Sequence, residues 1–339
     1  MNKTGLPIAL LCMLIALLFA ANLLVGSVHI PAREVLRILL GEDTGRESWR
    51  YIVLEARLPQ AVTAMLAGSA LSACGLLLQT AFRNPLAGAS ILGVNSGAGL
   101  GVAIVMLLLG GTVSAGAFSL SGFFSVLAGA MAGAMAVMAL ILFFSTLIRS
   151  SVMLLIIGLM VGYLASSAVS LLNFLSTAEG VQAYMVWGMG HFGGVSSEQL
   201  PAFASVVLLG LAGALLLVKP LNALLLGERY AANLGVRVRR TRHMLLVVAG
   251  VLTAITTAFC GPILFIDLAV PHIARLLLST ANHRVLLPAT MLAGAAVALV
   301  CNLVCVLPSG AGLIPLNAVT PLVGAPIVIY VIVSQRGLK

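Results

Sequence analysis

Ten long apolar segments follow one another along the 339-residue chain and leave few ways for it to fold. About 20 apolar residues in a helix cross the hydrocarbon layer of a membrane. Since 61% of the residues are hydrophobic and 8% charged, the chain has too few polar side chains to cover these segments as a soluble core. The sequence therefore predicts an all-α integral membrane protein, a single polytopic domain over 1–339. The predicted spans are 6–26, 60–82, 91–109, 118–147, 152–173, 200–218, 244–260, 262–279, 286–307 and 315–333.

The charged residues predict how the chain is threaded. Ten spans put both termini on one side, and with that side inside, the inner loops carry thirteen basic residues and one acid, Glu228. Lys3, Arg149 and Lys339 are counted among them. The outer loops carry five basic residues and seven acids. Such asymmetry is what the positive-inside rule predicts, so both termini are predicted to be cytoplasmic. The net charge of +9 then reflects topology and predicts no nucleic-acid partner.

The cysteines predict neither disulfides nor a metal site. All five lie inside apolar runs, and Cys301 and Cys305 share a helix face without a His or acid to complete a ligand set.

The first apolar run is long for a signal peptide and lacks a clear cleavage site, so we interpret it as the first span.

The loop over 219–243 holds six of the eighteen Lys and Arg residues. Within it, Gly227 and Gly235 bracket an amphipathic stretch from Glu228 to Leu234, which predicts a short helix with Gly at each end. A basic loop that only fixes topology would explain the arginines, but not the apolar turn in front of them. We interpret the turn as a docking element for a soluble partner.

Small residues form a stripe in the fifth span, where Gly158, Gly162, Ser166 and Ser170 recur every fourth position. Such a stripe lets another helix approach closely. Packing inside one subunit and a subunit interface or pathway lining are both open, and the serines favour a pathway because hydroxyls tolerate water.

Helix breakers recur at membrane depth, at Asn84-Pro85, Gly261-Pro262 and Pro271. Irregular backbone survives in a bilayer only inside protein or beside a wet cavity. The pattern favours a transporter or channel over a simple anchor.

Asp267 is the only acid within a predicted span, which makes it a functional candidate. A proton relay would suit a secondary transporter, but no second acid lies in any span, so a cavity-facing or protonated carboxyl is the favoured interpretation. His272 and Arg275 could be a ligand pair, although the adjacent Pro271 favours structural hydrogen bonding. An intramembrane enzyme using Ser96 is a distant third possibility, because no His is paired with it.

Several motifs resemble those of the FecCD-type permeases, the membrane subunits of ABC importers for iron–siderophores, haem and cobalamin. Arg57-Leu58-Pro59 precedes GSALSACGLLLQTAFRNPLAGASILGVNSGAG, which begins at Gly68. Trp187-x-x-Gly190, the LGE turn over 226–236 and Gly261-Pro262-Ile263 follow. Pro271-His272-x-x-Arg275 and Gly324-Ala325-Pro326 complete the set. The resemblance runs in order over nearly the whole chain.

The resemblance implies the type II ABC importer permease architecture, with about ten helices per subunit. It implies a homodimer around a central pathway that works by alternating access, two cytoplasmic ATP-binding subunits and an external substrate-binding protein. It also implies roles for particular residues. The ATPase-coupling set is Leu226, Gly227, Glu228, Ala231, Leu234, Gly235 and Val236. Arg57 would dock the binding protein, and the structural motifs are Arg83, Asn84, Pro85, Pro271, His272 and Arg275.

The chain departs from the family pattern at a few positions. Gln60 replaces the second arginine of RLPR, and Asn302 replaces an acid near the end of the ninth span. Outer docking is therefore expected to be weaker or differently charged, whereas the coupling turn is intact.

None of the three lysines follows a glycine-rich loop of P-loop spacing, so the chain is expected to hold no cofactor and no ATP of its own. Mg–ATP would lie on the partner subunits. The resemblance thus implies a non-enzymatic transport subunit in the bacterial inner membrane, importing a bulky metal chelate. The alternative is a proton- or ion-coupled transporter that uses Asp267.

Overall fold

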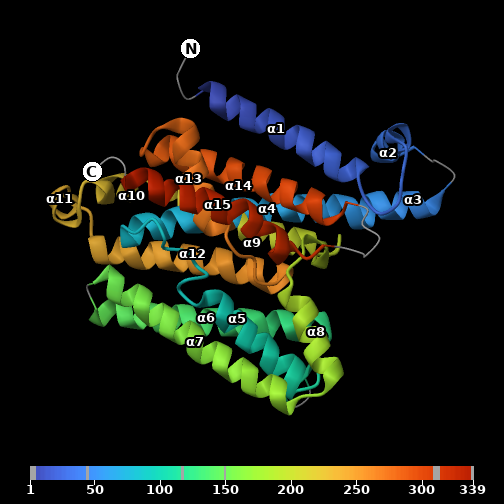
Figure 1. Ribbon diagram of the computed structural model, residues 1–339, viewed down its shortest axis with the longest axis horizontal. Helices are drawn as coiled ribbons and strands as arrows, with labels where there is room; N and C mark the ends of the chain where they lie inside the picture. Colours follow the sequence, from blue (N-terminus) through green and yellow to red (C-terminus); the bar gives the residue numbers. More distant parts are fainter. Residues whose placement is uncertain (1–4, 43–45, 116–117, 149, 308–313, 337–339) are drawn as a thin grey trace.

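A computed structural model describes residues 5–42, 46–115, 118–148, 150–307 and 314–336. Lys3, Arg149 and Lys339, predicted on the inner side, lie outside these ranges. The helices form a layered bundle whose long axis follows most of them, with one short β-hairpin (Figure 1). The elements are α1 (Gly5–Leu24), α2 (Ala32–Leu39), α3 (Glu47–Tyr51), η1 (Ile52–Arg57), α4 (Leu58–Phe82), α5 (Val94–Ala103), η2 (Ile104–Leu108), β1 (Thr112–Ala115), β2 (Phe118–Ser121), α6 (Phe123–Leu147), α7 (Ser151–Leu175), α8 (Ala178–Gly188), η3 (Phe192–Gly194), α9 (Leu200–Leu216), α10 (Val218–Leu225), α11 (Glu228–Asn233), α12 (Val238–Cys260), α13 (Ile266–Leu278), α14 (His283–Cys305) and α15 (Leu316–Arg336).

Helix α4 is the centre of the bundle and contacts α9, α12, α13 and α14. Its sequence is rich in Ala, Gly and Ser, which lets neighbouring backbones come close. At its crossing with α14, a Cβ added to Gly68 would overlap the Gly294 carbonyl oxygen. In the same contact Ser72 donates to the Thr290 carbonyl over 3.0 Å. Tight helix packing and buried hydroxyl hydrogen bonds thus replace a large-side-chain core here.

The predicted all-α membrane fold is confirmed, but the spans differ from the prediction. Among the described residues, six helices are long and apolar enough to cross a membrane, or seven if the bent α9–α10 pair is one span. Two further apolar helices, α5 with η2 and α13, occupy predicted spans but are shorter, and α15 covers the last predicted span with 21 residues from Leu316 to Arg336. Gly93 (φ +78°) and Gly261 (φ +75°) start or stop helices there, so chain predicted as span is loop instead.

The second span was also placed too short. We predicted that it begins at residue 60, yet α3, η1 and α4 run as one helical segment of 36 residues from Glu47 to Phe82. Conversely, the fourth span begins at Phe123 rather than 118, because β1 and β2 pair antiparallel just before it. The short helix predicted between Gly227 and Gly235 is confirmed as α11, and a second short helix, α2, lies between α1 and α3.

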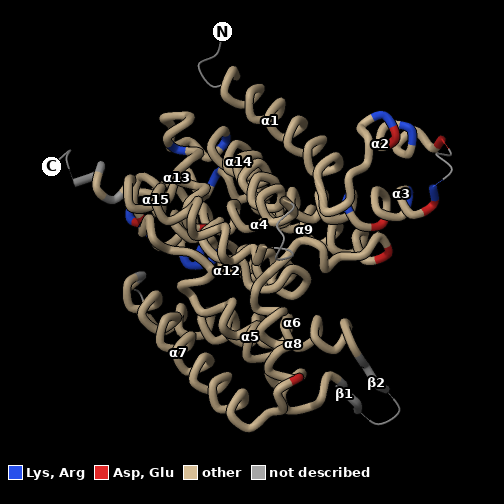
Figure 2. The backbone as a smooth tube through the Cα atoms, turned by 45° about the vertical axis from the view of Figure 1, so that its right-hand side comes forward, with Lys and Arg blue, Asp and Glu red and all other residues tan. Residues whose placement is uncertain are grey.

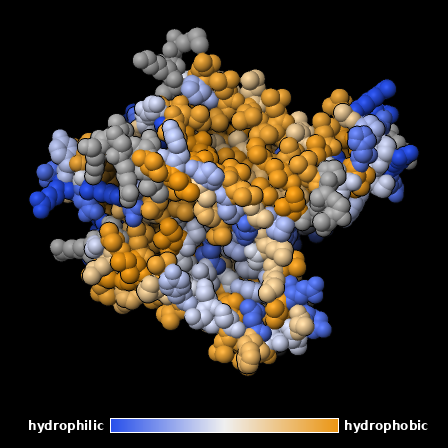
Figure 3. Space-filling model, in the orientation of Figure 1, coloured by the Kyte–Doolittle hydropathy of each residue, from blue (hydrophilic) through white to orange (hydrophobic). Residues whose placement is uncertain are grey.

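Charged residues gather at the two ends of the bundle and leave its middle almost free of them (Figure 2). One end carries α10, α11 and the start of α12, and the other carries α2 and α3; we call them the α11 end and the α2 end. Hydrophobic residues cover most of the upper part of the face shown in Figure 3, and a band of more polar residues crosses its lower centre. Helix α1 begins and α15 ends toward the α11 end (Figure 1). This distribution matches a bilayer around the middle of the bundle.

Candidate functional site

The turn from α10 to α12 presents apolar side chains to the outside. Gly227 has a φ of +113° and Gly235 a φ of +82°, so these glycines turn the chain sharply before and after α11. Between them Ala231 is fully buried and fixes one face of the short helix. The exposed side chains form what we call the α11 ridge, which consists of Leu225, Leu226, Tyr230 and Leu234. Exposed apolar patches of this kind mark interaction surfaces.

An ion pair fixes α11 against α12. Arg242 donates to the Glu228 carboxylate, and its side chain is only 10% exposed, compared with 45% for Glu228. Glu228 also lies in the first turn of α11, where a negative charge is favourable. Arg242 was not singled out from the sequence, because its role depends on a residue fourteen positions earlier.

The motif residues around Asn84 and His272 meet at the α11 end. The His272 imidazole hydrogen-bonds the Pro85 carbonyl over 3.0 Å, which assigns the ring proton to Nε2. The Asn84 carboxamide oxygen accepts from the Leu86 amide, forming the turn after α4. Arg275 donates to the Gln79 carboxamide oxygen over 2.7 Å. His272 thus fastens the loop after α4 to α13, and Arg275 fastens the last turn of α4 to the same helix.

A second polar cluster, missed in the sequence, joins α4, α10 and α14. The Asn222 carboxamide oxygen accepts from the backbone amide of His283 over 2.8 Å and from its Nδ1 over 3.0 Å. The other ring nitrogen of His283 lies 2.9 Å from the Thr80 hydroxyl. In the sequence, these three polar residues lie near the ends of apolar runs, and that position could have indicated the cluster.

Asp267 is 2% exposed and lies in the first turn of α13. Its carboxylate accepts from the Ser90 hydroxyl over 3.0 Å and from the Ser90 amide over 3.3 Å. Gly88 packs against it so closely that an added Cβ would lie 2.6 Å from Oδ2. The carboxylate therefore joins the 84–93 loop to α13.

The small-residue stripe on α7 is divided between two environments. Gly158 and Gly162 are buried against the start of α5, where an added Cβ at Gly158 would lie 2.8 Å from the Leu92 Cα. Ser166 and Ser170 are exposed. Steps of four residues advance about 40° beyond a full turn, so the stripe winds around the helix. The glycines serve packing within the chain, and only the serines face outward.

Comparison with known proteins identifies the family. The model of the FecCD transport family matches residues 13–334, which is nearly the whole chain. The chain belongs to the FecCD transport family. The vitamin B12 import system permease protein BtuC of Klebsiella pneumoniae is 34% identical over 288 residues, covering 85% of this chain and 84% of that protein.

Other similar proteins agree with this assignment. A Methanocaldococcus jannaschii protein described as an ABC transporter permease is 30% identical over 346 residues, covering 98% of this chain and 97% of that protein. The solved structure of a metal-chelate type ABC transporter in an inward-facing conformation aligns with a TM-score of 0.81 and 30% identity. It covers 94% of this chain and 97% of that chain.

At the α2 end of this FecCD-family protein, Arg57 is not free for docking. It is 7% exposed, and Nη1 donates to the carbonyls of Leu23 and Leu24 over 2.9 and 3.0 Å. Nη2 donates to the Val28 carbonyl, and Gly26 packs against the guanidinium. The sequence placed Arg57 in an outer loop, whereas it lies within the long helical segment and fastens the chain that follows α1.

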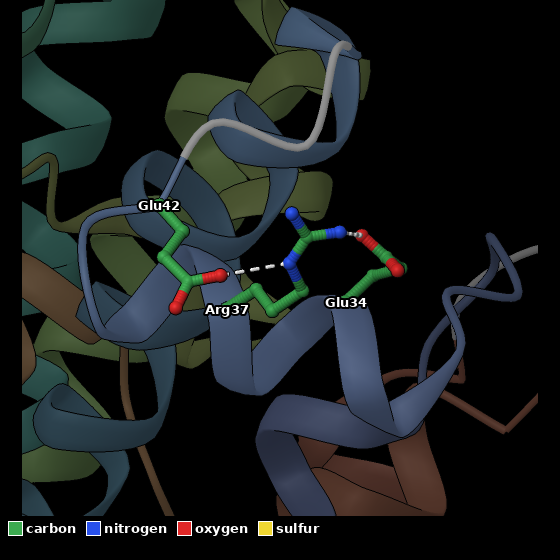
Figure 4. A network of polar contacts seen from close by, with 3 residues as sticks. All are labelled: Glu34, Arg37 and Glu42. Carbon is green, nitrogen blue, oxygen red and sulfur yellow. Dashed lines mark hydrogen bonds and ion pairs between the residues drawn. The ribbon is translucent and has the colours of Figure 1, made fainter.

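The exposed charges at this end lie on α2 and α3 instead. Arg37 donates from Nε to Glu42 over 2.8 Å, and its Nη1 lies 3.5 Å from Glu34 (Figure 4). These carboxylates raise the pKa of Arg37. The Arg46 guanidinium lies 4.3 Å from the Trp49 ring centroid.

Gln60, the departure from the family pattern, also points inward. Its amide donates to the Asn302 carboxamide oxygen over 2.9 Å, and Asn302 donates to Asn22 over 2.8 Å. A chain of neutral amides therefore joins α4, α14 and α1. The substitution at position 60 concerns this buried contact as much as any outer surface.

A cavity of about 560 Å³ lies beside α8. Its walls include Phe123, Phe259, Trp187 and His191. The buried indole nitrogen of Trp187 has no hydrogen-bond partner among the described residues. Within those residues, no group of three or more His, Cys, Asp or Glu side chains could hold a metal ion.

Proposed function

We propose that the chain is the transmembrane permease subunit of an ATP-driven importer for a bulky metal chelate, such as an iron–siderophore, haem or cobalamin. The observation that carries this proposal is the α11 ridge, four exposed apolar side chains on a glycine-bounded turn at one charged end of a membrane bundle. The similarity to a vitamin B12 import permease and to a metal-chelate type ABC transporter supports the substrate class.

In this proposal, a pair of cytoplasmic ATP-binding subunits binds the α11 ridge and drives transport by hydrolysing ATP. The chain itself lacks a P-loop, so Mg–ATP belongs to those subunits. The α11 end is then cytoplasmic, as its excess of basic residues favours, and both termini lie on that side of the bacterial inner membrane.

The pathway in this proposal lies between two copies of the chain. Only 28% of the most apolar stretch of α7 is buried within one copy. Ser166 and Ser170 are exposed on that helix, and hydroxyls facing lipid are less favourable than hydroxyls facing a partner helix or water. A homodimer that covers part of α7 and leaves the serines beside a central passage would carry substrate by alternating access.

An external substrate-binding protein completes the assembly. Since Nη1 and Nη2 of Arg57 are engaged within the chain, we place the docking charges on α2, on α3 and just before α3, where Arg33, Arg50 and Arg46 are exposed. Complementary acidic side chains on the binding protein would steer it to this end.

Reconstitution tests the proposed function. Vesicles that contain the permease, its ATP-binding subunit and a loaded binding protein should accumulate cyanocobalamin or a ferric siderophore only with Mg–ATP. Vesicles lacking the ATP-binding subunit are the control. Uptake in the control driven by a proton gradient would overturn the proposal.

Reversing the charge of Glu228 should uncouple the transporter. Glu228→Arg would face the mostly buried Arg242 side chain, and the repulsion would displace α11. We expect ATP-driven uptake to fall roughly tenfold or more. The double variant Glu228→Arg/Arg242→Glu re-forms the pair in the opposite sense and should regain most of the uptake. Full uptake in the single variant would contradict the role of the turn.

Asp267 separates the two function classes. Asp267→Asn keeps an acceptor for Ser90, so we expect ATP-driven uptake near wild type and a stability loss of about 1 kcal/mol. A proton-coupled transporter would instead lose uptake, because a carboxamide does not exchange the proton. Measured uptake with Mg–ATP or with an imposed proton gradient distinguishes the two cases.

A further inference from the structure

A cavity of about 440 Å³ opens beside the α11 ridge. One wall is the end of α4 with the Arg83 that follows it, and another is the last turn of α13 with Arg275. The chain from Leu224 to Gly227, which leads into the ridge, closes a third side. Two guanidinium groups thus line one cavity, and no acidic residue lines it.

Arg275 is only partly satisfied within the chain. Its one hydrogen-bond partner among the described residues is the neutral carboxamide of Gln79. The C-terminal end of α13 compensates a fraction of its charge, but no carboxylate lies within ion-pair distance in the described ranges. Binding of an anion would stabilise a partly buried guanidinium that has no carboxylate partner.

Arg83 adds a second charge that the fold positions firmly. It has a φ of +47° at the end of α4, a conformation that turns the chain out of the helix. Nη2 donates to the Leu224 carbonyl over 3.2 Å and lies against Gly227. In the part of the chain that the structure describes, its other N–H groups have no partner.

The neighbouring titratable groups do not neutralise these two charges. Glu228, the nearest acid along the turn, is already paired with Arg242. His272 and His283 lie on the same side as Arg275 and add no negative charge. The cavity therefore carries positive charge that no acid in its lining neutralises.

We propose that Arg83 and Arg275 form a socket for an acidic side chain of the ATP-hydrolysing subunit. The proposal rests on the proposed function. The socket is continuous with the α11 ridge through Leu225 and Leu226, so a protein that covers the ridge also covers the mouth of the cavity. A carboxylate inserted there would meet two guanidinium donors, which fixes its position as apolar contacts on the ridge alone do not.

The test measures binding of the ATP-binding subunit to the permease in nanodiscs of phosphatidylcholine alone. Arg83→Gln, at an exposed position, should weaken binding roughly tenfold or more and reduce its salt dependence. Arg275→Gln should do the same, and Arg83→Gln keeps the test valid if that buried variant does not fold. Arg239→Gln, an exposed basic residue at the same end that does not line the cavity, should stay within about twofold. An Asp or Glu to Lys change on the partner that restores binding to Arg83→Glu would identify the inserted side chain.

Three results would overturn the socket. Arg83→Gln and Arg275→Gln that bind like wild type would remove its role while leaving the proposed function intact. A loss seen only when phosphatidylglycerol is present would assign the cavity to a lipid headgroup. Failure of the wild-type permease to bind an ATP-binding subunit would reject the proposed function and, with it, this occupant.

Discussion

Replacing Gly75 by alanine is expected to separate α4 from α13. A Cβ at this position would overlap the Asp267 carbonyl oxygen and lie 2.6 Å from its carbonyl carbon. These are backbone atoms at the start of a helix, so no side-chain rotation can relieve the overlap. Overpacking costs about 1–3 kcal/mol and occasionally more, and we expect a loss of at least 3 kcal/mol here. Thermal unfolding of the purified protein in nanodiscs measures it.

Gly213→Ala is the matched control for this variant. Gly213 lies within α9, and the nearest atom to an added Cβ is the Val248 Cγ2 at 3.5 Å, an ordinary contact. Because alanine favours a helix over glycine, this control should be neutral or gain up to about 1 kcal/mol. Equal stability of Gly75→Ala and wild type would mean that α4 and α13 do not touch as described.

Arg57→Ala should produce the second large effect. The change removes every donor that holds the carbonyls of Leu23, Leu24 and Val28 in place. A buried acceptor left without a donor costs about 1–3 kcal/mol, and some water will reach this edge, so we expect a loss of about 3 kcal/mol in total. Limited proteolysis should also cut the segment between α1 and α2 faster.

Arg50→Ala controls for charge at the same end. Arg50 is exposed on α3, and its removal should change stability by less than about 0.5 kcal/mol. The sequence-based interpretation of Arg57 makes the opposite prediction: unchanged stability with weaker affinity for the external binding protein. Measuring both quantities for both variants decides between a structural and a docking role.

The features that hydrophobicity and glycine placement control could be predicted from the sequence. All ten apolar segments became helices, and the turn between Gly227 and Gly235 became α11, because short-range patterning determines both. The predicted start of a span failed where a turn with a positive φ precedes the helix inside an apolar run, as at Gly93 before α5. Apolar composition does not show where the backbone turns.

The partners of polar residues could not be predicted, since they lie far away in the chain. Arg57 bonds carbonyls about thirty positions earlier, and Arg275 bonds Gln79, 196 positions away. The prediction that the small residues of α7 share one face was wrong for a different reason. The residues recur at every fourth position, but the helix repeats every 3.6 residues, so Ser170 lies about 120° around the helix from Gly158.

The 36-residue helical segment that ends in α4 has a mechanical consequence. At 1.5 Å per residue it is about 54 Å long, well beyond the roughly 30 Å of hydrocarbon. The segment therefore connects the α2 end of the bundle to the α11 end. Tilting this segment by about 5° about one end displaces the other end by about 5 Å. A movement at the α2 end would therefore also move the chain at the α11 end.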